Sequence, residues 1–255
     1  MSNLVETAQQ GRVRRIWLNR PEKRNALTVE LCVALADAIE DGAADPATGV
    51  ILLGARGEVF CAGMDLAEAT GVSADPIDRA HERLFTIGSR LEKPLVIAVE
   101  GAALGGGAGL VGNGHIVVAA EDAVFGLTEI RLGLWPFLVY RALGAAMGDR
   151  RTLELALTGR TFRAREAREL GLVHEVSVDC DIRAMEIAKG LAVSSPTAIR
   201  YGMGFVRESR GKDWESMGEI ARRHRGEVLR SLDFAEGVAA FREKREPRWP
   251  SLERT

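Results

Sequence analysis

The sequence predicts an α/β protein with an all-helical C-terminal region. Short apolar segments typical of strands alternate with amphipathic helical segments through the first half of the chain. Beyond a domain boundary expected near Ser194–Pro196, the pattern contains helices and no clear strand. A length of 255 residues, 46% of them apolar, suits one large domain or one domain with a small appendage. We therefore expect a core formed by residues 1–195 and a helical region formed by residues 196–255, serving as an assembly surface or a substrate lid.

The expected strands are short apolar runs bounded by turn residues. The first ends at the turn-like run Asn19–Pro21, and Pro94 opens the third, which is apolar throughout. The four predicted strands are Val13–Leu18, Val50–Leu53, Leu95–Val99 and Ile116–Ala120.

The expected helices begin with a segment capped by Thr28 and continuing to about Ala44. Leu31, Leu35 and Ile39 lie on one stripe of that helix, the pattern of a face packed on a core. A short helix is expected after the glycine-rich stretch that follows the third strand. Further helices are predicted at Asp78–Glu92, Asp179–Val193, Ala198–Glu208 and Asp213–Lys244.

Composition excludes several classes of protein. A net charge of −2 lacks the basic excess that a nucleic-acid binder normally shows. The cysteines, Cys32, Cys61 and Cys180, suit neither a disulfide framework nor a zinc site, and no two histidines have metal-ligand spacing. Residues 1–10 lack the apolar core of a leader, and no apolar run reaches membrane-spanning length. We expect no metal, no nucleic-acid or membrane partner, and a reducing, cytoplasmic setting.

The glycine-rich segment GAALGGGAGLVG, residues 101–112, contains the spacing G-x-G-x-x-G at Gly107, Gly109 and Gly112. In a dinucleotide-binding unit these glycines follow a strand directly, and an acidic residue ends the next strand about 20 residues later. Here the preceding strand ends near Val99, and Glu121 comes only 14 residues after Gly107. A helix, a turn and a strand do not fit comfortably in that space, so the pattern disfavours a dinucleotide site.

Two other interpretations of this segment remain. The glycines can form a flexible or closely packed loop. Alternatively, Gly105 and Gly106 lack Cβ atoms, so a ligand oxygen can approach their N–H groups just where a helix begins. Such donors suit an oxygen that becomes negatively charged during a reaction.

Six segments, in family order along nearly the whole chain, resemble the crotonase (enoyl-CoA hydratase/isomerase) superfamily. Each match is weak alone, whereas six in order at family-like separations are highly specific. They are LNRPEKRNAL at 18–27, AGMDL at 62–66, ALGGG at 103–107 after the strand KPLVIAVEG, FGLTEIRLGL at 125–134, LTGRTFRAREARELGLV at 157–173 and AFREKR at 240–245.

The resemblance implies a crotonase-like spiral of ββα units followed by a C-terminal helical trimerisation region. It implies an acyl-CoA or enoyl-CoA substrate, with coenzyme A as part of the substrate and no separate cofactor. It also implies a homotrimer or homohexamer.

The same resemblance implies roles for individual residues. The backbone N–H groups of Met64 and Gly106 correspond to an oxyanion hole, and Glu129 corresponds to the second catalytic glutamate of the family. Phe241 and Lys244 match a C-terminal pair that reaches coenzyme A, usually from a neighbouring subunit. The positions that match the coenzyme A pocket are Arg24, Ala26, Ala62, Asp65 and Leu66.

The two positions that correspond to the family's catalytic glutamates determine the chemistry that we expect. Apolar residues surround Glu129 in the sequence, and desolvation of a carboxylate raises its proton affinity, which suits a base near neutral pH. The first glutamate of the family falls on Gly109, which cannot transfer a proton. Hydration with two carboxylates is therefore impaired unless another group substitutes, while a single base is enough for double-bond isomerisation. Glu68, Glu121 and Asp122 are the nearby acids.

Several functions stay open at this point. The first is an enoyl-CoA hydratase/isomerase-type enzyme, with a Δ3-Δ2-enoyl-CoA isomerase as the alternative to a hydratase. Related hydrolases carry an aspartate where this chain has Phe137, which argues against thioester hydrolysis. Trp135 and Phe137 can wall an acyl pocket, although core packing is expected for at least one. The other candidates are a non-catalytic homologue that binds coenzyme A esters and a nucleotide-dependent oxidoreductase.

Overall fold

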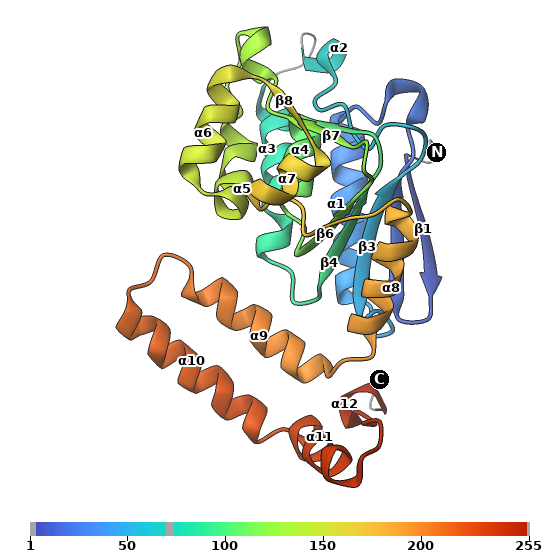
Figure 1. Cartoon of the computed structure of the whole chain (residues 1–255), viewed down its shortest axis with the longest axis vertical. Helices are drawn as coiled ribbons and strands as arrows, with labels where there is room; N and C mark the ends of the chain where they lie inside the picture. Colours follow the sequence, from blue (N-terminus) through green and yellow to red (C-terminus); the bar gives the residue numbers. More distant parts are fainter. Residues whose placement is uncertain (1–3, 70–73, 254–255) are drawn as a thin grey trace.

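The computed structural model describes residues 4–69 and 74–253, and it has the predicted α/β architecture. A twisted sheet with helices on both faces forms the core, and a helical arm extends from it at one end (Figure 1). Within the described ranges, no helix combines the length and the apolarity needed to span a membrane. The three cysteines are buried and unpaired.

The main sheet has six strands in the order β1-β2-β3-β4-β6-β9. Strand β1 pairs antiparallel with β2, and all the other neighbours are parallel. The central strands β3 and β4 are almost completely buried, which agrees with their continuous apolar sequences. The strands are β1 Val5–Gln10, β2 Val13–Leu18, β3 Val50–Ala55, β4 Leu95–Val99, β6 Ile116–Ala119 and β9 Glu175–Val176.

A second sheet of three short strands was not predicted from the sequence. Its order is β5-β7-β8, formed by Ala102–Leu104, Val124–Gly126 and Thr161–Arg163. Strand β5 leads directly into helix α4, Gly106–Val111, at Gly105. The end of β7 is joined to the same turn, because the N–H of Gly105 donates to the carbonyl of Gly126 at 2.8 Å. This sheet therefore brings two distant segments of the sequence to one place.

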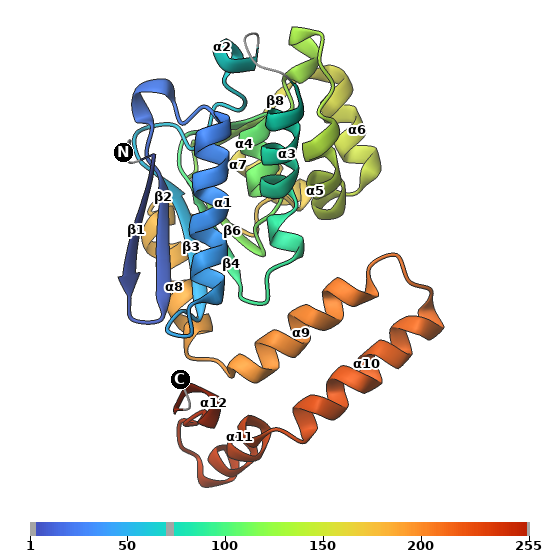
Figure 2. The ribbon, with the colours of Figure 1, turned by 180° about the vertical axis from the view of Figure 1, so that it is seen from behind.

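Helices cover both faces of the main sheet. Helix α1, Val29–Ala44, lies on one face and α8, Cys180–Ala192, on the other, as the two opposite views show (Figures 1 and 2). The predicted cap of α1 is confirmed, since Thr28 Oγ1 accepts a hydrogen bond from the N–H of Leu31 at 3.1 Å. The remaining core helices are α2 Leu66–Ala69, α3 Ala74–Phe85, α5 Phe137–Met147, α6 Asp149–Thr158 and α7 Ala164–Leu170, with 3-10 turns η1 Pro21–Lys23, η2 Ile87–Ser89 and η3 Glu129–Leu132.

The prediction of one helix over Asp78–Glu92 was wrong at its C-terminal end. Helix α3 ends at Phe85, and η2 follows it. The buried side chain of Asn113 explains this end: its Nδ2 donates to the carbonyl of Phe85 at 2.9 Å, and its Oδ1 accepts from the N–H of Gly88 at 3.1 Å. These bonds satisfy backbone groups that a longer helix would have used.

The C-terminal region contains α9, Pro196–Ser209, and α10, Trp214–Leu229, which pack antiparallel as an arm directed away from the sheet (Figure 1). The helix predicted over Asp213–Lys244 is divided into α10 and α11, Leu232–Glu243, because Ser231 caps a new helix by accepting from the N–H of Phe234 at 3.1 Å. A short helix α12, Pro250–Glu253, follows.

Candidate active site

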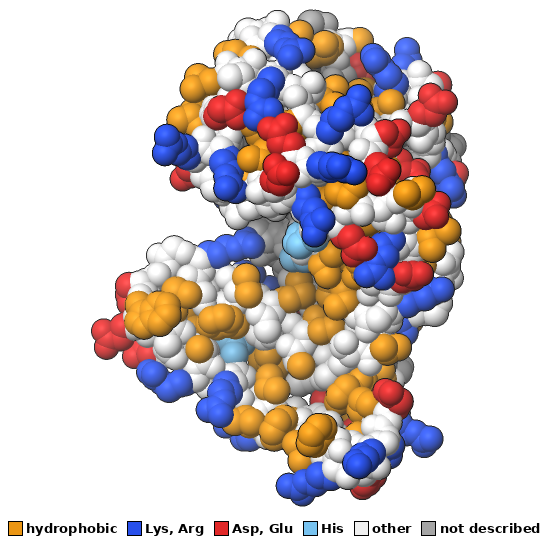
Figure 3. Space-filling view, viewed as in Figure 1, with side chains coloured by type: hydrophobic (Ala, Val, Ile, Leu, Met, Phe, Trp, Pro, Cys, Tyr) orange, Lys and Arg blue, Asp and Glu red, His pale blue; other side chains and the backbone are white. Residues whose placement is uncertain are grey.

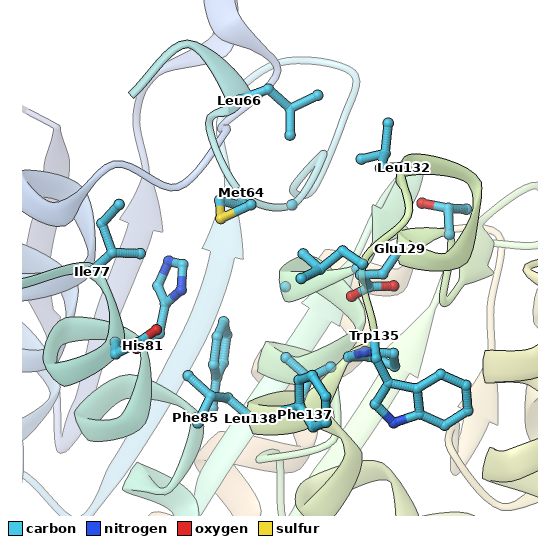
Figure 4. Close-up of a pocket in the computed structure, with 18 of the residues that line it drawn as sticks. Met64, Leu66, Ile77, His81, Phe85, Glu129, Leu132, Trp135, Phe137 and Leu138 are labelled. Atoms are coloured by element: carbon cyan, nitrogen blue, oxygen red, sulfur yellow. The ribbon is translucent and has the colours of Figure 1, made fainter. Parts of the chain in front are cut away.

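A cavity of about 650 Å³, open to the surface, lies in the core beside helix α3 (Figure 4). Four segments form its walls: the loop at residues 62–66, helix α3, the Gly105–Gly106 turn, and residues 128–139. Most of the lining is apolar, and a few polar groups converge on it. This composition is typical of a site that binds a small organic ligand.

The backbone amides of Met64 and Gly106 lie on neighbouring segments at the wall of this cavity. Leu27 forms a parallel bridge with Met64: its N–H donates to the carbonyl of Gly63 at 2.8 Å, and its carbonyl accepts from Asp65 at 2.9 Å. Because donors alternate in direction along an extended segment, the N–H of Met64 points away from Leu27. The Gly63 and Gly106 backbones pack so closely that a Cβ on Gly106 would lie 3.7 Å from Gly63 Cα.

Gly106 is the first residue of α4, and its N–H is therefore among the donors that a helix leaves without an intrahelical partner. Within the described ranges, neither this N–H nor that of Met64 has a hydrogen-bond acceptor. Two free amides on adjacent segments are the donors that an oxyanion hole requires.

Glu129 enters the cavity from the turn that follows β7. Its carboxylate packs against the Gly105 turn, where a Cβ would approach Glu129 Oε1 to 3.1 Å. The Oε2 atom is buried and has no hydrogen-bond partner among the described residues. Burial raises the pKa of Glu129 above its ordinary value. A carboxylate with a free, desolvated oxygen beside two open amides is suited to accept a proton from a bound ligand.

The raised pKa of Glu129 predicts a pH dependence of turnover. Only the ionised carboxylate can act as a base, so kcat should rise with pH through the pKa of Glu129. That limb is expected at higher pH than for an exposed glutamate, because burial disfavours the ionised form. A kcat profile between about pH 4 and 9 measures it. A rise in kcat at the pH where an exposed glutamate titrates would contradict the buried environment of the Glu129 carboxylate.

The space that a side chain at Gly109 would occupy is filled. A Cβ at this position would lie 2.4 Å from Val139 Cγ1 and 3.3 Å from Phe85 Cδ1, although Gly109 lies on α4 one turn after Gly105. The other acids considered from the sequence do not replace it. Glu68 accepts a hydrogen bond from the N–H of Val29 at 2.8 Å, and the exposed residues Glu121 and Asp122 lie outside the cavity lining. Glu129 is therefore the one carboxylate that is not exposed among the described cavity-lining residues.

Gly63 holds the loop that carries the Met64 amide. Its φ of +95° favours glycine, and a Cβ would lie 2.9 Å from the carbonyl oxygen of Leu104. We expect Gly63→Ala to shift this loop and lower kcat by about 10²–10³-fold, the usual cost of losing one oxyanion donor. Gly11→Ala is a matched control, since Gly11 also has a positive φ but an added Cβ would meet nothing within 4 Å. Equal kcat values in the two variants would contradict a role for the loop.

The residues predicted to hold coenzyme A fall into two groups. Ala62 and Leu66 line the cavity, and Leu66 is half exposed at its edge. Arg24 is exposed beside them, and its carbonyl accepts from the N–H of Ala62 at 3.0 Å. Ala26 is half-buried on the same turn.

The Asp65 side chain is engaged within the protein. Its Oδ2 accepts from Arg20 at 2.6 Å, and its Oδ1 accepts from the N–H of Ala67 at 3.0 Å, which holds the start of α2. The Arg20 guanidinium lowers the pKa of Asp65. The Asp65 side chain thus stabilises the loop at residues 62–66. Its contact with coenzyme A remains a prediction.

Phe241 and Lys244 lie at the end of α11, and neither lines the cavity of its own chain. The side chain of Phe241 is 85% exposed, and Lys244 is exposed with a positive φ of 55°. In Figure 1, α11 lies at the opposite end of the molecule from α2 and α3. One chain therefore does not bring this pair together with Glu129.

Part of the lining was not identified from the sequence. Helix α3 contributes Ile77, His81 and Phe85, which recur every four residues on its inner face. That spacing is visible in the sequence, but it predicts only a packed face. Trp135 and Phe137 both line the cavity. Trp135 also packs against the core, whereas Phe137 is 71% exposed.

The chain matches known proteins over almost its whole length. The profile of the enoyl-CoA hydratase/isomerase family matches residues 8–252. A protein named putative enoyl-CoA hydratase from Thermus thermophilus is 36% identical, with 94% of this chain and 98% of that protein covered. A 1,2-epoxyphenylacetyl-CoA isomerase from Escherichia coli is 32% identical, with 98% of both proteins covered.

The structure also matches solved structures of this family. A crystal structure of an enoyl-CoA hydratase from Bacillus anthracis superimposes with a TM-score of 0.90 at 31% identity, covering 97% of this chain and 99% of that one. The expected crotonase-like fold, including its C-terminal helices, is therefore confirmed. The chain belongs to the enoyl-CoA hydratase/isomerase family of the crotonase superfamily.

Proposed function

We propose that this enzyme is an enoyl-CoA isomerase, which moves a double bond of an acyl-CoA thioester with Glu129 as its single general acid and base. The observation that carries the proposal is the packing at Gly109, where Val139 and Phe85 occupy the place of a second acid. Isomerisation needs one group that removes and returns a proton, whereas the two-carboxylate mechanism of hydration needs two acid–base groups.

The proposed reaction begins with a 3-enoyl-CoA whose thioester oxygen accepts from the amides of Met64 and Gly106. Glu129 removes a proton from C2. The electron pair of the broken C2–H bond forms a C1–C2 double bond conjugated with C3–C4, and the carbonyl π pair moves onto the thioester oxygen. The two amides stabilise the resulting dienolate oxygen. Glu129 then returns the proton to C4 as the C2–C3 double bond forms. Atoms and charge balance without water, and no cofactor beyond the coenzyme A of the substrate is required.

Hydration is the second candidate, because relatives such as the Thermus thermophilus protein carry the name enoyl-CoA hydratase. Because Gly109 has no acidic side chain, hydration requires another group to activate water. Val139 and Phe85 fill the space around Gly109, and this packing argues against hydration in this chain.

We expect this enzyme to assemble as a homotrimer or a homohexamer. Apolar side chains remain exposed along the C-terminal helices, with Trp214 88% and Phe241 85% exposed, and apolar groups are visible on this arm in Figure 3. Surfaces of this kind mark contacts with other chains. In such an assembly, Phe241 and Lys244 can reach the coenzyme A of a neighbouring subunit.

Parallel assays with 3-hexenoyl-CoA and crotonyl-CoA test the proposed reaction. We expect conversion of 3-hexenoyl-CoA into 2-hexenoyl-CoA, and hydration of crotonyl-CoA at least about 100-fold slower, in line with the usual contribution of one acid–base group. Hydration as fast as isomerisation would overturn the proposal. Turnover of neither substrate would favour another reaction of the family or a non-catalytic homologue.

A further inference from the structure

His81 is a buried polar group of the cavity to which the proposed proton transfer assigns no role. It lies on α3, its side chain is directed toward the cavity in Figure 4, and its exposed fraction is only 7%. Among the residues that the structure describes, no hydrogen-bond partner reaches either ring nitrogen, and the ring instead packs against Phe85 at a centroid distance of 5.3 Å. Neither ring nitrogen is among the fully enclosed polar atoms that lack a partner, so a ligand or water in the cavity can reach them.

The other three histidines differ from His81 because each has a ring nitrogen that forms a hydrogen bond within the fold. His115 accepts from the N–H of Leu95 at 2.9 Å and contacts the carbonyl of Gly88 at 2.9 Å. His174 accepts from the N–H of Val117 at 3.1 Å, and His224 contacts Glu208 at 3.1 Å. Each has at least one ring nitrogen bonded within the fold, although His224 Nδ1 is buried without a partner. Neither ring nitrogen of His81 is bonded, and its side chain lines the cavity, so we expect its partner to come with the ligand.

The position of His81 relates it to the acyl chain of the substrate. Phe85 separates it from the oxyanion turn, because a Cβ on Gly106 would meet Phe85 Cζ at 3.1 Å. Glu129 and His81 enter from opposite sides in Figure 4. A thioester held at Gly106, with its reacting carbons beside Glu129, therefore places the more distal acyl carbons within reach of the α3 wall.

The charges around His81 indicate which polar group it receives. Burial lowers the pKa of His81, although Asp78 acts in the opposite direction, so burial favours the neutral form of the ring. A neutral imidazole offers one donor and one acceptor, which matches a hydroxyl group, and its donor matches a keto oxygen. Asp78 and Glu82 are exposed at the rim of the cavity on the same helix, and they disfavour an acyl chain that ends in a carboxylate.

We propose that His81 is a specificity-determining residue, which hydrogen-bonds an uncharged oxygen on the distal acyl chain. This inference rests on the proposed acyl-CoA isomerase function and narrows its substrate class to hydroxy- or oxo-substituted 3-enoyl-CoA esters. A site built around a hydrogen-bonding group discriminates against the analogue that lacks the partner, because the buried group is then left unsatisfied.

The test compares matched substrates that differ only in a terminal hydroxyl group: 3-hexenoyl-CoA with its 6-hydroxy derivative, and 3-octenoyl-CoA with its 8-hydroxy derivative. We expect wild-type kcat/KM to favour the hydroxylated member of at least one pair by about tenfold to a hundredfold. His81→Phe should abolish this preference, and His81→Gln, which keeps a donor and an acceptor, should retain part of it. Arg79→Gln is the control, since Arg79 is exposed on the same helix and lies outside the cavity lining.

Two outcomes would overturn the proposal: equal kcat/KM values within both wild-type pairs, or a preference that survives in His81→Phe. The dissociation constants of hexanoyl-, 6-hydroxyhexanoyl-, octanoyl- and 8-hydroxyoctanoyl-CoA, measured by calorimetry, separate this test from that of the proposed function. These saturated ligands cannot isomerise. A His81-dependent binding preference without turnover would therefore refute the isomerase and support the specificity role.

Discussion

Replacement of Glu129 by glutamine is expected to lower kcat for 3-hexenoyl-CoA by about 10²–10⁴-fold, the usual contribution of a general acid–base group. Glutamine keeps the shape of the side chain but cannot accept the proton. Because Glu129 Oε2 is buried without a partner, removal of its charge should not reduce stability at neutral pH. Steady-state kinetics and the dissociation constant of hexanoyl-CoA together separate a loss of chemistry from a loss of binding.

Glu121→Gln is a matched control for this substitution. Glu121 is exposed, lies outside the cavity lining and undergoes the same chemical change. We expect wild-type kcat in this variant. If Glu129→Gln retained wild-type turnover of the true substrate, Glu129 would have no part in the proton transfer, and a non-catalytic role for the cavity would have to be considered.

Gly109→Ala is expected to destabilise the protein by about 1–3 kcal/mol, the usual cost of overpacking a core. The reason is the 2.4 Å approach of the new Cβ to Val139 Cγ1. In a Val139→Gly background the same substitution should cost clearly less, because the opposing side chain is gone. Denaturant unfolding of the wild type, both single variants and the double variant measures this coupling.

Gly190→Ala serves as the control for the Gly109 series. Gly190 lies in α8, and an added Cβ would meet nothing within 4 Å, so alanine should stabilise the helix by about 0.5–1 kcal/mol. We also expect that Gly109→Glu alone does not create hydratase activity, since its carboxylate has no room. A stable Gly109→Glu variant that hydrates crotonyl-CoA would show that the space is available.

Much of the site could be predicted because it is built from short segments with distinctive chemistry. The glycines at 105 and 106 indicated free amide donors, and the apolar neighbours of Glu129 indicated a desolvated base, whereas the role of Met64 followed from the family resemblance. Ala62 and Leu66 belong to the same loop as Met64 and line the same cavity. The structure brings these separate segments together through the Leu27–Met64 bridge and the second sheet.

Other features depend on contacts between distant residues that no local pattern reveals. The sequence shows that Gly109 lacks a carboxylate, but not that Val139, thirty positions later, occupies its place. Likewise, the end of α3 depends on Asn113, a side chain from another element. Strand β1 was not predicted because its sequence is largely polar, as suits an edge strand that pairs on one side only.

The central claim is that two amides hold the thioester oxygen while Glu129 lies beside the carbon that loses its proton. A crystal structure of the Glu129→Gln variant with bound 3-hexenoyl-CoA tests it most directly. We predict the thioester oxygen within about 3 Å of the backbone nitrogens of both Met64 and Gly106, and the residue 129 side chain in contact with C2. A thioester bound elsewhere, or a residue 129 side chain turned away from C2, would contradict the account.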